Sequence, residues 1–469
     1  MLLHSLPALW AGKAVYAGLR AIGRGGTVLP GVVAQRLDPA LARRLTAGLP
    51  HGVVLVAGTN GKTTTARMLA AALERGGLRV VYNREGANLL SGVTSRLVQA
   101  ASFSGRLRAD VAVMELDEAA FPHAIRALAP RVVVLHNLFR DQLDRYGEVD
   151  AIARRWWDAL HALPPAATAV INGDDPRLAA LAGALPPGAR ALFYAVRDPR
   201  HALERLPHAA DSANCPRCGS PLCYTELYLS HLGAYRCLHC SFVAPEPQVT
   251  ARWIELDGID GVRLALEHSG ETVPLHLNVP GLYNAYNALA AVSAALACGV
   301  ALSQATAALQ GFRAAFGRAE RLEIRGRQVA IFLVKNPVGF NEVLRTLFPL
   351  GTDLQSAPGA RLLIVINDLD ADGRDVSWLW DVDFEALPGR VEWVIVSGIR
   401  AHDMALRLKY AGLAPDQVHL EPDLKRAFDL AVERTPVGAR VCVLPTYTAM
   451  LALRRVLARR RLVPHMLSG

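Results

Sequence analysis

The chain has 469 residues, of which 52% are hydrophobic and 20% are charged. This composition is typical of globular proteins, and at about 150 residues per domain the length suffices for about three domains. No long run of uncharged apolar residues occurs, and the N-terminal region lacks a small-residue cleavage site after an apolar core, which argues against a membrane-spanning or secreted protein. We therefore expect a cytoplasmic protein.

The formal net charge of +9 comes from 51 lysines and arginines against 42 acidic residues. Such a surplus suits anionic partners, including nucleotides, polyphosphates, anionic lipids and nucleic acids, and does not choose among them. The seven cysteines are too few for a disulfide scaffold, and four of them form two C-x-x-C pairs. A reducing compartment fits this pattern best.

Residues 1–48 predict an N-terminal helical segment. The apolar and basic residues between positions 9 and 24 fit an amphipathic helix. Such a helix either packs on its own domain or contacts a membrane surface. We favour packing on its own domain.

Residues 49–320 predict a central α/β domain. Short apolar runs separated by helical segments indicate a parallel sheet that is covered on both faces, with strands at 53–57, 80–83, 111–115, 132–135 and 168–172. The pattern breaks at about residue 206, and residues of about 206–250 predict an insertion rich in cysteine and proline. Strands at 251–256 and 262–268 and helices at 284–298 and 303–312 complete the domain.

Residues 321–469 predict a second, Rossmann-like α/β domain. The polar residues 318–321 look like the approach to a linker, and beyond them a new alternation begins, with strands at 329–334, 362–366, 391–396 and 440–444. This spacing is typical of a doubly wound sheet, which binds ligands at the carboxyl ends of its strands.

A phosphate-binding loop joins the first central strand to the helix predicted at 63–74. It reads Gly58-Thr59-Asn60-Gly61-Lys62-Thr63-Thr64. Consecutive backbone amides at a helix N-terminus attract phosphate, Lys62 can reach the β and γ phosphates of ATP, and the Thr63 hydroxyl can bind Mg²⁺. A glycine turn without a ligand is the plainer alternative. The lysine, the threonines and the preceding strand together favour a nucleotide site.

The paired cysteines predict a zinc ribbon in the insertion. Cys215 and Cys218 form one pair and Cys237 and Cys240 the other, a spacing that suits four tetrahedral thiolates. Four thiolates leave no open position for catalysis, so we expect structural zinc. Cys223 is a fifth candidate with a poorer spacing.

Several further segments, taken in order, resemble the Mur ligases and their relative folylpolyglutamate synthase. Besides the loop, they are Met114 to Glu118 at a strand end, the segment from His136 to Gly147, Asn172-Gly173-Asp174-Asp175-Pro176, Gly281 to Ala288, and Phe316 to Arg321. The resemblance covers most of the chain. It implies that Glu115 and Thr63 hold Mg²⁺, and that Asp174, Asn287 and Arg318 contribute to the ATP site.

One departure from the family pattern concerns the lysine that peptide-adding Mur ligases carbamylate. The corresponding neighbourhood reads Ala153-Arg154-Arg155-Trp156-Trp157 and contains no lysine, so metal binding must differ in detail and an ordinary amino-acid-adding activity is less expected. Gln142 also stands in place of the usual histidine.

The zinc ribbon and the third domain are similar to one branch of the family, the ligase-like subunits of lipid II isoglutaminyl synthase. The matching segments are Lys335 to Glu342, Asn367-Asp368, Ala371 to Asp381, and Pro445 to Met450. This resemblance implies an enzyme that uses ATP to amidate the α-carboxylate of D-glutamate in the lipid II stem peptide, through an acyl phosphate, at the inner face of a bacterial membrane.

The same resemblance implies a heterodimer with a glutaminase subunit of the GatD type, because this chain shows no convincing glutaminase nucleophile. An aspartate of this chain would then complete the partner's Cys-His pair. Asp381 is our first candidate, followed by Asp375 and Asp372. Two alternatives stay open: a folylpolyglutamate synthase-like or amino-acid-adding ligase, and a zinc-ribbon protein that binds nucleic acid. The ribbon lacks a dense basic and aromatic face, so we expect no nucleic-acid partner.

Overall fold

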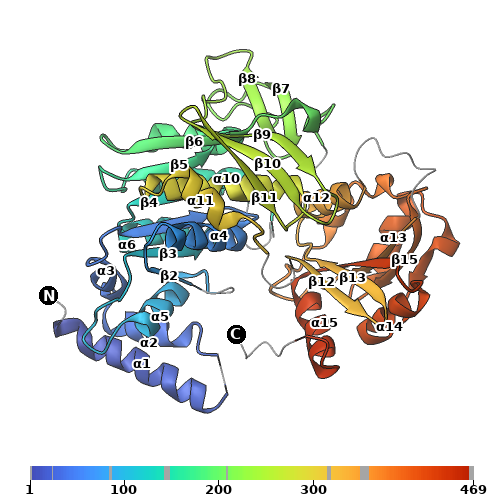
Figure 1. Ribbon diagram of the computed structural model, residues 1–469, viewed down its shortest axis with the longest axis horizontal. Coiled ribbons are helices and arrows are strands. Elements are labelled where there is room, and N and C mark those ends of the chain that lie inside the picture. Colours follow the sequence, from blue (N-terminus) through green and yellow to red (C-terminus); the bar gives the residue numbers. More distant parts are fainter. Residues whose placement is uncertain are drawn as a thin grey trace.

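The structure is a computed structural model, and it describes residues 3–23, 25–83, 87–141, 148–207, 210–313, 318–348 and 359–463, with only the backbone of Arg318 and Ala319. Residues 142–147, Phe316 and Gly317, which belong to two of the family-like segments, lie outside the described residues. Two α/β units are visible in Figure 1, one running from blue to yellow and the other from orange to red.

The first unit is built on a sheet of nine strands in the order β11-β10-β9-β6-β5-β4-β1-β3-β2. Its strands are β1 (Val53–Ala57), β2 (Val80–Tyr82), β3 (Val111–Leu116), β4 (Val132–Leu135), β5 (Thr168–Asn172), β6 (Arg190–Val196), β9 (Val249–Leu256), β10 (Val262–His268) and β11 (Glu271–Leu277). Pairing is parallel from β2 to β9, whereas β10 pairs antiparallel with both β9 and β11. The expected parallel sheet is thus confirmed, and β6 and β11 are strands that the sequence analysis did not identify.

Helices cover both faces of this sheet, because its central strands are apolar on both sides. The helices are α1 (Leu6–Ala21), α2 (Leu29–Leu37), α3 (Leu41–Thr46), α4 (Lys62–Arg75), α5 (Leu90–Ala100), α6 (Phe121–Leu128), α8 (Val149–Leu160), α9 (Pro176–Ala180), α10 (Leu282–Ala297) and α11 (Leu302–Leu309). One buried cluster joins the sheet to α4, α10 and α11, and a second joins it to the remaining helices. Every residue of β1 and β3 is buried, as expected for the centre of a doubly covered sheet.

The cysteine-rich insertion leaves the sheet after β6 and returns at β9, its parallel neighbour. Within it, β7 (Leu222–Leu229) and β8 (Leu232–Cys237) form an antiparallel hairpin. Figure 1 shows this hairpin projecting from one end of the first unit.

The second unit is a sheet of six strands in the order β12-β13-β17-β14-β15-β16. Its elements are β12 (Arg318–Ile324), β13 (Arg327–Phe332), α12 (Pro337–Leu347), β14 (Ala360–Val365), β15 (Val391–Ser397), α13 (Ala401–Tyr410), β16 (Val418–Leu420), α14 (Leu424–Arg434), β17 (Arg440–Pro445) and α15 (Tyr447–Arg459). All pairs are parallel except β12 with β13. Buried clusters on its two faces make a second core.

The expectation of a linker at residues 318–321 is wrong. These residues begin β12, which pairs with β13 at the edge of the second sheet. An edge strand is covered on one side only, so charged residues interrupt its sequence, which alternates from Arg321 to Ile324 and lacks the continuous apolar run of a central strand.

The N-terminal helix packs on its own unit, as expected. Ala8, Leu9 and Gly12 of α1 are buried, and their helix contacts α2 and α5. Within the described ranges, none of the helices has both the length and the apolar character needed to cross a bilayer.

Candidate active site

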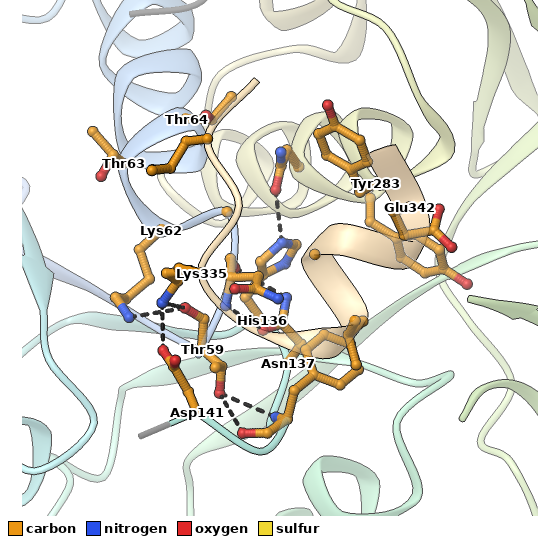
Figure 2. Close-up of a pocket in the computed structure, with 18 of the residues that line it drawn as sticks. Thr59, Lys62, Thr63, Thr64, His136, Asn137, Asp141, Tyr283, Lys335 and Glu342 are labelled. Carbon is orange, nitrogen blue, oxygen red and sulfur yellow. Dashed lines mark hydrogen bonds and ion pairs between the residues drawn. The ribbon is translucent and has the colours of Figure 1, made fainter. Parts of the chain in front are cut away.

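A cleft of about 440 Å³ lies where the carboxyl ends of strands from both sheets approach each other. The first unit contributes the ends of β1, β3 and β4, and the second contributes the end of β13 with the residues that follow it. Figure 2 shows Lys335 of the second unit directed toward Thr59 and Asp141 of the first. Ligands of doubly wound sheets bind at this edge, so the topology alone marks the cleft as a candidate site.

The phosphate loop forms one wall of the cleft, from Thr59 to Thr64. Gly61 precedes α4 with a φ of +80°, and a Cβ at this position would lie 2.9 Å from Nε2 of His136 and overlap the amide of Asn287. Only glycine can adopt this positive φ without strain and also fit, because the space holds no room for a Cβ atom. The loop therefore has the tight turn into a helix N-terminus that a bound phosphate requires.

Lys62 is buried in the cleft among carboxylates. Its Nζ lies 3.1 Å from Oε2 of Glu118 and donates to the backbone carbonyl of Thr59 at 3.2 Å. Burial alone would lower the pKa of Lys62, but the negative charges of Glu118, Glu115 and other carboxylates outweigh it and raise the pKa. Lys62 is therefore held fully protonated at the place where phosphate charge would gather.

A second lysine reaches the same loop from the other unit. Nζ of Lys335, which follows β13, donates to the Thr59 carbonyl at 3.1 Å and forms an ion pair with Asp141. Next to it, Asn336 accepts a hydrogen bond from the backbone N–H of Gly339 and so caps α12. Two lysines from two domains thus converge on one carbonyl of the phosphate loop.

His136 and Asn287 form a buried network behind the loop. His136 lies 2.7 Å from the hydroxyl of Tyr194 through Nδ1 and 2.8 Å from Oδ1 of Asn287 through Nε2. Burial lowers the pKa of His136 to about 4, so the ring is neutral near pH 7. Because the amide oxygen of Asn287 can only accept, Nε2 carries the proton and Nδ1 accepts from Tyr194. The network holds Asn287 of α10 next to Gly61 of the loop.

The candidate magnesium ligands Thr63 and Glu115 both line the cleft, together with Asp117 and Glu118. In the neighbourhood of residues 153–157, where the family resemblance led us to look for a modified lysine, α8 buries Trp156. Its side chain is fully buried, and Nε1 donates to the backbone carbonyl of Glu118 at 2.9 Å. The indole therefore supports the strand end that bears the carboxylates, without supplying a metal ligand.

The other end of the cleft is apolar and is suited to a flat base. Its lining residues come from the turn of the β7–β8 hairpin, from α10 and from α12: Leu229, Leu232, Tyr283, Val338 and Val343. Glu342 lies among them, and burial raises its pKa to about 7, although Arg345 acts in the opposite direction. A polar end with lysines and an apolar end with an aromatic ring match the two halves of a nucleotide.

The four paired cysteines come together at the base of the hairpin. The sulfur atoms of Cys215, Cys218, Cys237 and Cys240 all lie within 4.8 Å of one another. This compact set suits one tetrahedral metal ion. Cys223 does not belong to the group, which agrees with its poorer spacing.

The remaining candidate residues lie outside the cleft or outside the described side chains. Asp174 is fully buried, where it binds Arg197 at 2.7 Å and accepts from the hydroxyl of Tyr286 at 2.8 Å; Tyr286 itself lines the cleft. The side chain of Arg318 is not among those described, so its predicted role remains a prediction.

The three candidate aspartates of the second unit have different surroundings. Asp372 is buried and accepts hydrogen bonds from the backbone and hydroxyl of Thr448. Asp375 is exposed and accepts from the backbone N–H of Ser377. Asp381 is partly exposed, and its Oδ2 lies 3.4 Å from Nη1 of Arg140.

Four further residues belong to the site although the sequence did not predict them as site residues: Lys335, Glu118, His136 and Glu342. The sequence does contain a signal for Lys335 and Glu342, because their segment follows a predicted strand of the second sheet and ligands bind at such strand ends. Only the folded arrangement brings that strand end to the phosphate loop.

Comparisons with known proteins agree with this geometry. Residues 56–211 match the Mur ligase middle domain and residues 333–450 match the MurT ligase C-terminal domain. A pseudomurein peptide ligase type C from Methanothermus fervidus superposes with a TM-score of 0.66 at 22% identity, over 89% of this chain and 80% of that one. The fold is therefore that of the Mur ligases.

Two curated relatives extend over almost the whole chain. Both are named lipid II isoglutaminyl synthase (glutamine-hydrolyzing) subunit MurT. The protein from Streptococcus pneumoniae is 31% identical over 478 residues, which cover 99% of each chain, and that from Staphylococcus aureus is 29% identical over 454 residues, which cover 96% of this chain and 97% of the relative. The chain belongs to the MurT family.

Proposed function

We propose that this chain is the synthetase subunit of a lipid II isoglutaminyl synthase. It uses ATP to convert the α-carboxylate of D-glutamate in the stem peptide into a carboxamide, with ammonia from a glutaminase subunit of the GatD type. The observation that carries this proposal is the single cleft in which the phosphate loop meets Lys335 and Asn336 of the MurT-type domain.

The polar end of the cleft supports phosphoryl transfer. Lys62 and Lys335 both reach the Thr59 carbonyl and are placed to neutralise phosphate oxygens, while Thr63 and Glu115 would hold a magnesium ion that shields the same charge. The protein itself forms no covalent bond in such a transfer. Its main tasks are to position the reacting groups and to stabilise the charge of the transition state.

The reaction has two steps, phosphorylation of the carboxylate and attack of ammonia. An oxygen of the substrate carboxylate attacks the γ-phosphorus, the bond to the leaving ADP breaks, and an acyl phosphate forms. The lone pair of ammonia then attacks the acyl carbon, phosphate leaves with the bonding electrons, and the nitrogen loses a proton. Asp117 lines the cleft beside the loop, where it can accept that proton through water.

The cysteines support an external source of ammonia. Burial raises the pKa of Cys298 to about 11 and that of Cys442 to about 12, so neither thiol forms a nucleophilic thiolate near neutral pH. Four of the others form the metal-type cluster, for which we propose structural zinc, and Cys223 does not line the cleft. These surroundings support a partner that hydrolyses glutamine.

Asp381 remains our first candidate for the residue that orients the partner's catalytic histidine. Asp372 is buried and bonded to Thr448, whereas the Asp381 carboxylate is partly exposed and lies 3.4 Å from Arg140. Replacement of Asp381 by asparagine should abolish glutamine-driven amidation and leave ammonium-driven amidation intact. Asp375→Asn provides the matched control on the same segment, and loss of glutamine use in that variant alone would transfer the role to Asp375.

The proposal is tested by supplying each nitrogen source separately. The chain alone should release ADP and phosphate with lipid II and ammonium but not with glutamine, and addition of the glutaminase subunit should make glutamine effective. Glutamine-driven turnover by the isolated chain would contradict the proposal, and turnover that needs a free amino acid in place of ammonium would favour an amino-acid-adding ligase.

A further inference from the structure

The solvent face of α1 has an unusual composition for a surface helix. Among its exposed positions only Arg20 bears a charge, and the others are uncharged: Pro7, Trp10, Ala14, Ala17, Gly18 and Ala21. A helix at the surface of a globular protein normally places charged and polar residues on this side. The opposite side of α1 packs on α2 and α5 through the apolar residues Ala8, Leu9 and Gly12. Both sides of the helix are therefore largely apolar.

Two large aromatic side chains project from this face. Trp10 is 49% exposed, and its Nε1 donates to the backbone carbonyl of Phe103 at 2.9 Å. Phe103 is 73% exposed, on a turn held by a hydrogen bond of 2.8 Å from the backbone N–H of Ser102 to the carbonyl of Arg106. The structure thus presents two neighbouring rings to solvent, an arrangement typical of anchors at a water–lipid interface.

Further apolar side chains continue the surface at the far end of α1. Ile22, which follows the last residue of the helix, is 66% exposed, and Leu29 at the beginning of α2 is also exposed. Isolated exposed apolar residues are ordinary, but residues gathered along one helix and its flanking turns indicate a docking surface.

Basic side chains border this apolar surface. At 100° per residue, Lys13 and Arg20 lie on the same margin of the stripe that contains Trp10, and Nζ of Lys13 is 5.2 Å from the ring centroid of Phe103. Arg106 and Arg108 are exposed on the segment that follows Phe103.

Acidic residues are almost absent from this part of the chain. The first 50 residues contain six basic residues and the single carboxylate of Asp38, which is paired with Arg44 at 2.6 Å. The surface is therefore complementary to an anionic layer.

We propose that this surface, named the α1 face and comprising Trp10, Lys13, Ala14, Ala17, Arg20 and Phe103, docks on an anionic lipid membrane. The helix would lie in the plane of the interface, with the two rings among the acyl chains and the basic side chains beside the headgroups. This inference goes beyond the proposed function, because lipid binding requires neither ATP nor a partner.

The test is co-flotation of the full chain with vesicles of phosphatidylglycerol and phosphatidylcholine, compared with phosphatidylcholine alone. Trp10→Glu/Phe103→Glu should lower the partition by about tenfold or more on the mixed vesicles. Lys13→Glu/Arg20→Glu should lower it selectively on those vesicles, by about fivefold or more per residue, and the wild-type binding should weaken in high salt. Ile399→Glu/Val437→Glu, at exposed apolar residues of the second unit, is the matched control and should bind as the wild type does.

Each outcome decides the proposal. Retained ATP turnover and an unchanged thermal transition would show that the variants fold, and Phe103→Ser provides a milder replacement if the double variant does not. Absence of wild-type flotation, equal flotation on both vesicle types, or flotation unchanged by the α1 variants would overturn the proposal. Loss of co-elution with the glutaminase subunit in those variants, with lipid binding retained, would identify the surface as a protein interface and also overturn it.

Discussion

Asn60 of the phosphate loop and Asn336 before α12 exchange two side-chain hydrogen bonds, of 3.2 and 3.0 Å, across the junction of the two units. A reciprocal amide pair of this kind fixes both the distance and the orientation of the two surfaces. The nucleotide loop and the MurT-type domain are therefore linked directly, without an intervening element.

This pair should be energetically coupled. Asn60→Ala and Asn336→Ala should each lower the free energy of unfolding by about 1 kcal/mol, and Asn336→Ala by more because it also removes the cap of α12. In a double-mutant cycle measured by urea denaturation, we expect a coupling energy of about 0.5–2 kcal/mol. Additive effects of the two replacements would show that the pair does not join the units.

Lys62 should be essential for turnover but not for folding. Lys62→Ala removes the cation that faces the phosphates, so ATP turnover should fall by at least about a hundredfold. It also leaves Glu118 with less compensation, which lowers stability. Lys62→Ala/Glu118→Gln should recover stability without recovering turnover. A folded Lys62→Ala chain that still hydrolyses ATP would refute the role of the loop.

The cysteine cluster should bind zinc and support the apolar end of the cleft. Cys237→Ser should remove most of the zinc measured by elemental analysis, and it should raise KM for ATP because Leu229 and Leu232 of the attached hairpin line the cleft. Cys223→Ser, on the same hairpin but outside the cluster, should retain both metal and KM. Zinc content that is unchanged in Cys237→Ser would exclude the four-cysteine site.

Glu342 should make stability depend on pH. Its pKa of about 7 in the folded chain is above the ordinary glutamate value of 4.5, so the folded state holds the extra proton between these values. The associated stabilisation is complete below pH 4.5 and is lost as the pH rises through 7.

Glu342→Gln should therefore be more stable than the wild type at pH 8, by about 3 kcal/mol at most, and similar to it at pH 4.5. Chemical denaturation at the two pH values measures this difference. Glu433→Gln, at an exposed position of α14, is the control and should show the wild-type pH dependence. An identical pH dependence in Glu342→Gln would show that the wild-type carboxyl titrates normally.

The sequence predicted the features that depend on local order along the chain. The run Val53–Ala57 is continuous in apolar residues and is followed by glycines and a lysine, so both the buried strand and the loop could be identified. The two C-x-x-C pairs likewise predicted the cluster, because metal ligands must be close in space and their spacing is characteristic.

The features that the sequence did not predict depend on contacts between distant segments. Lys335 lies 276 positions after Thr59, and no local pattern indicates that its Nζ reaches that carbonyl. The turn of the β7–β8 hairpin lines the cleft only because the insertion folds back over α10 and α12. The edge strand β12 was mistaken for a linker because its solvent side is charged.

We propose above that this chain uses ATP and ammonia to amidate the stem peptide. The most direct measurement is mass spectrometry of lipid II after incubation with this chain, ATP, Mg²⁺ and isotopically labelled ammonium, with Lys62→Ala as control. We expect one labelled carboxamide on the α-carboxyl of D-glutamate, formed only when ATP is present and Lys62 is intact. Unmodified lipid II, or label at another carboxyl, would contradict it.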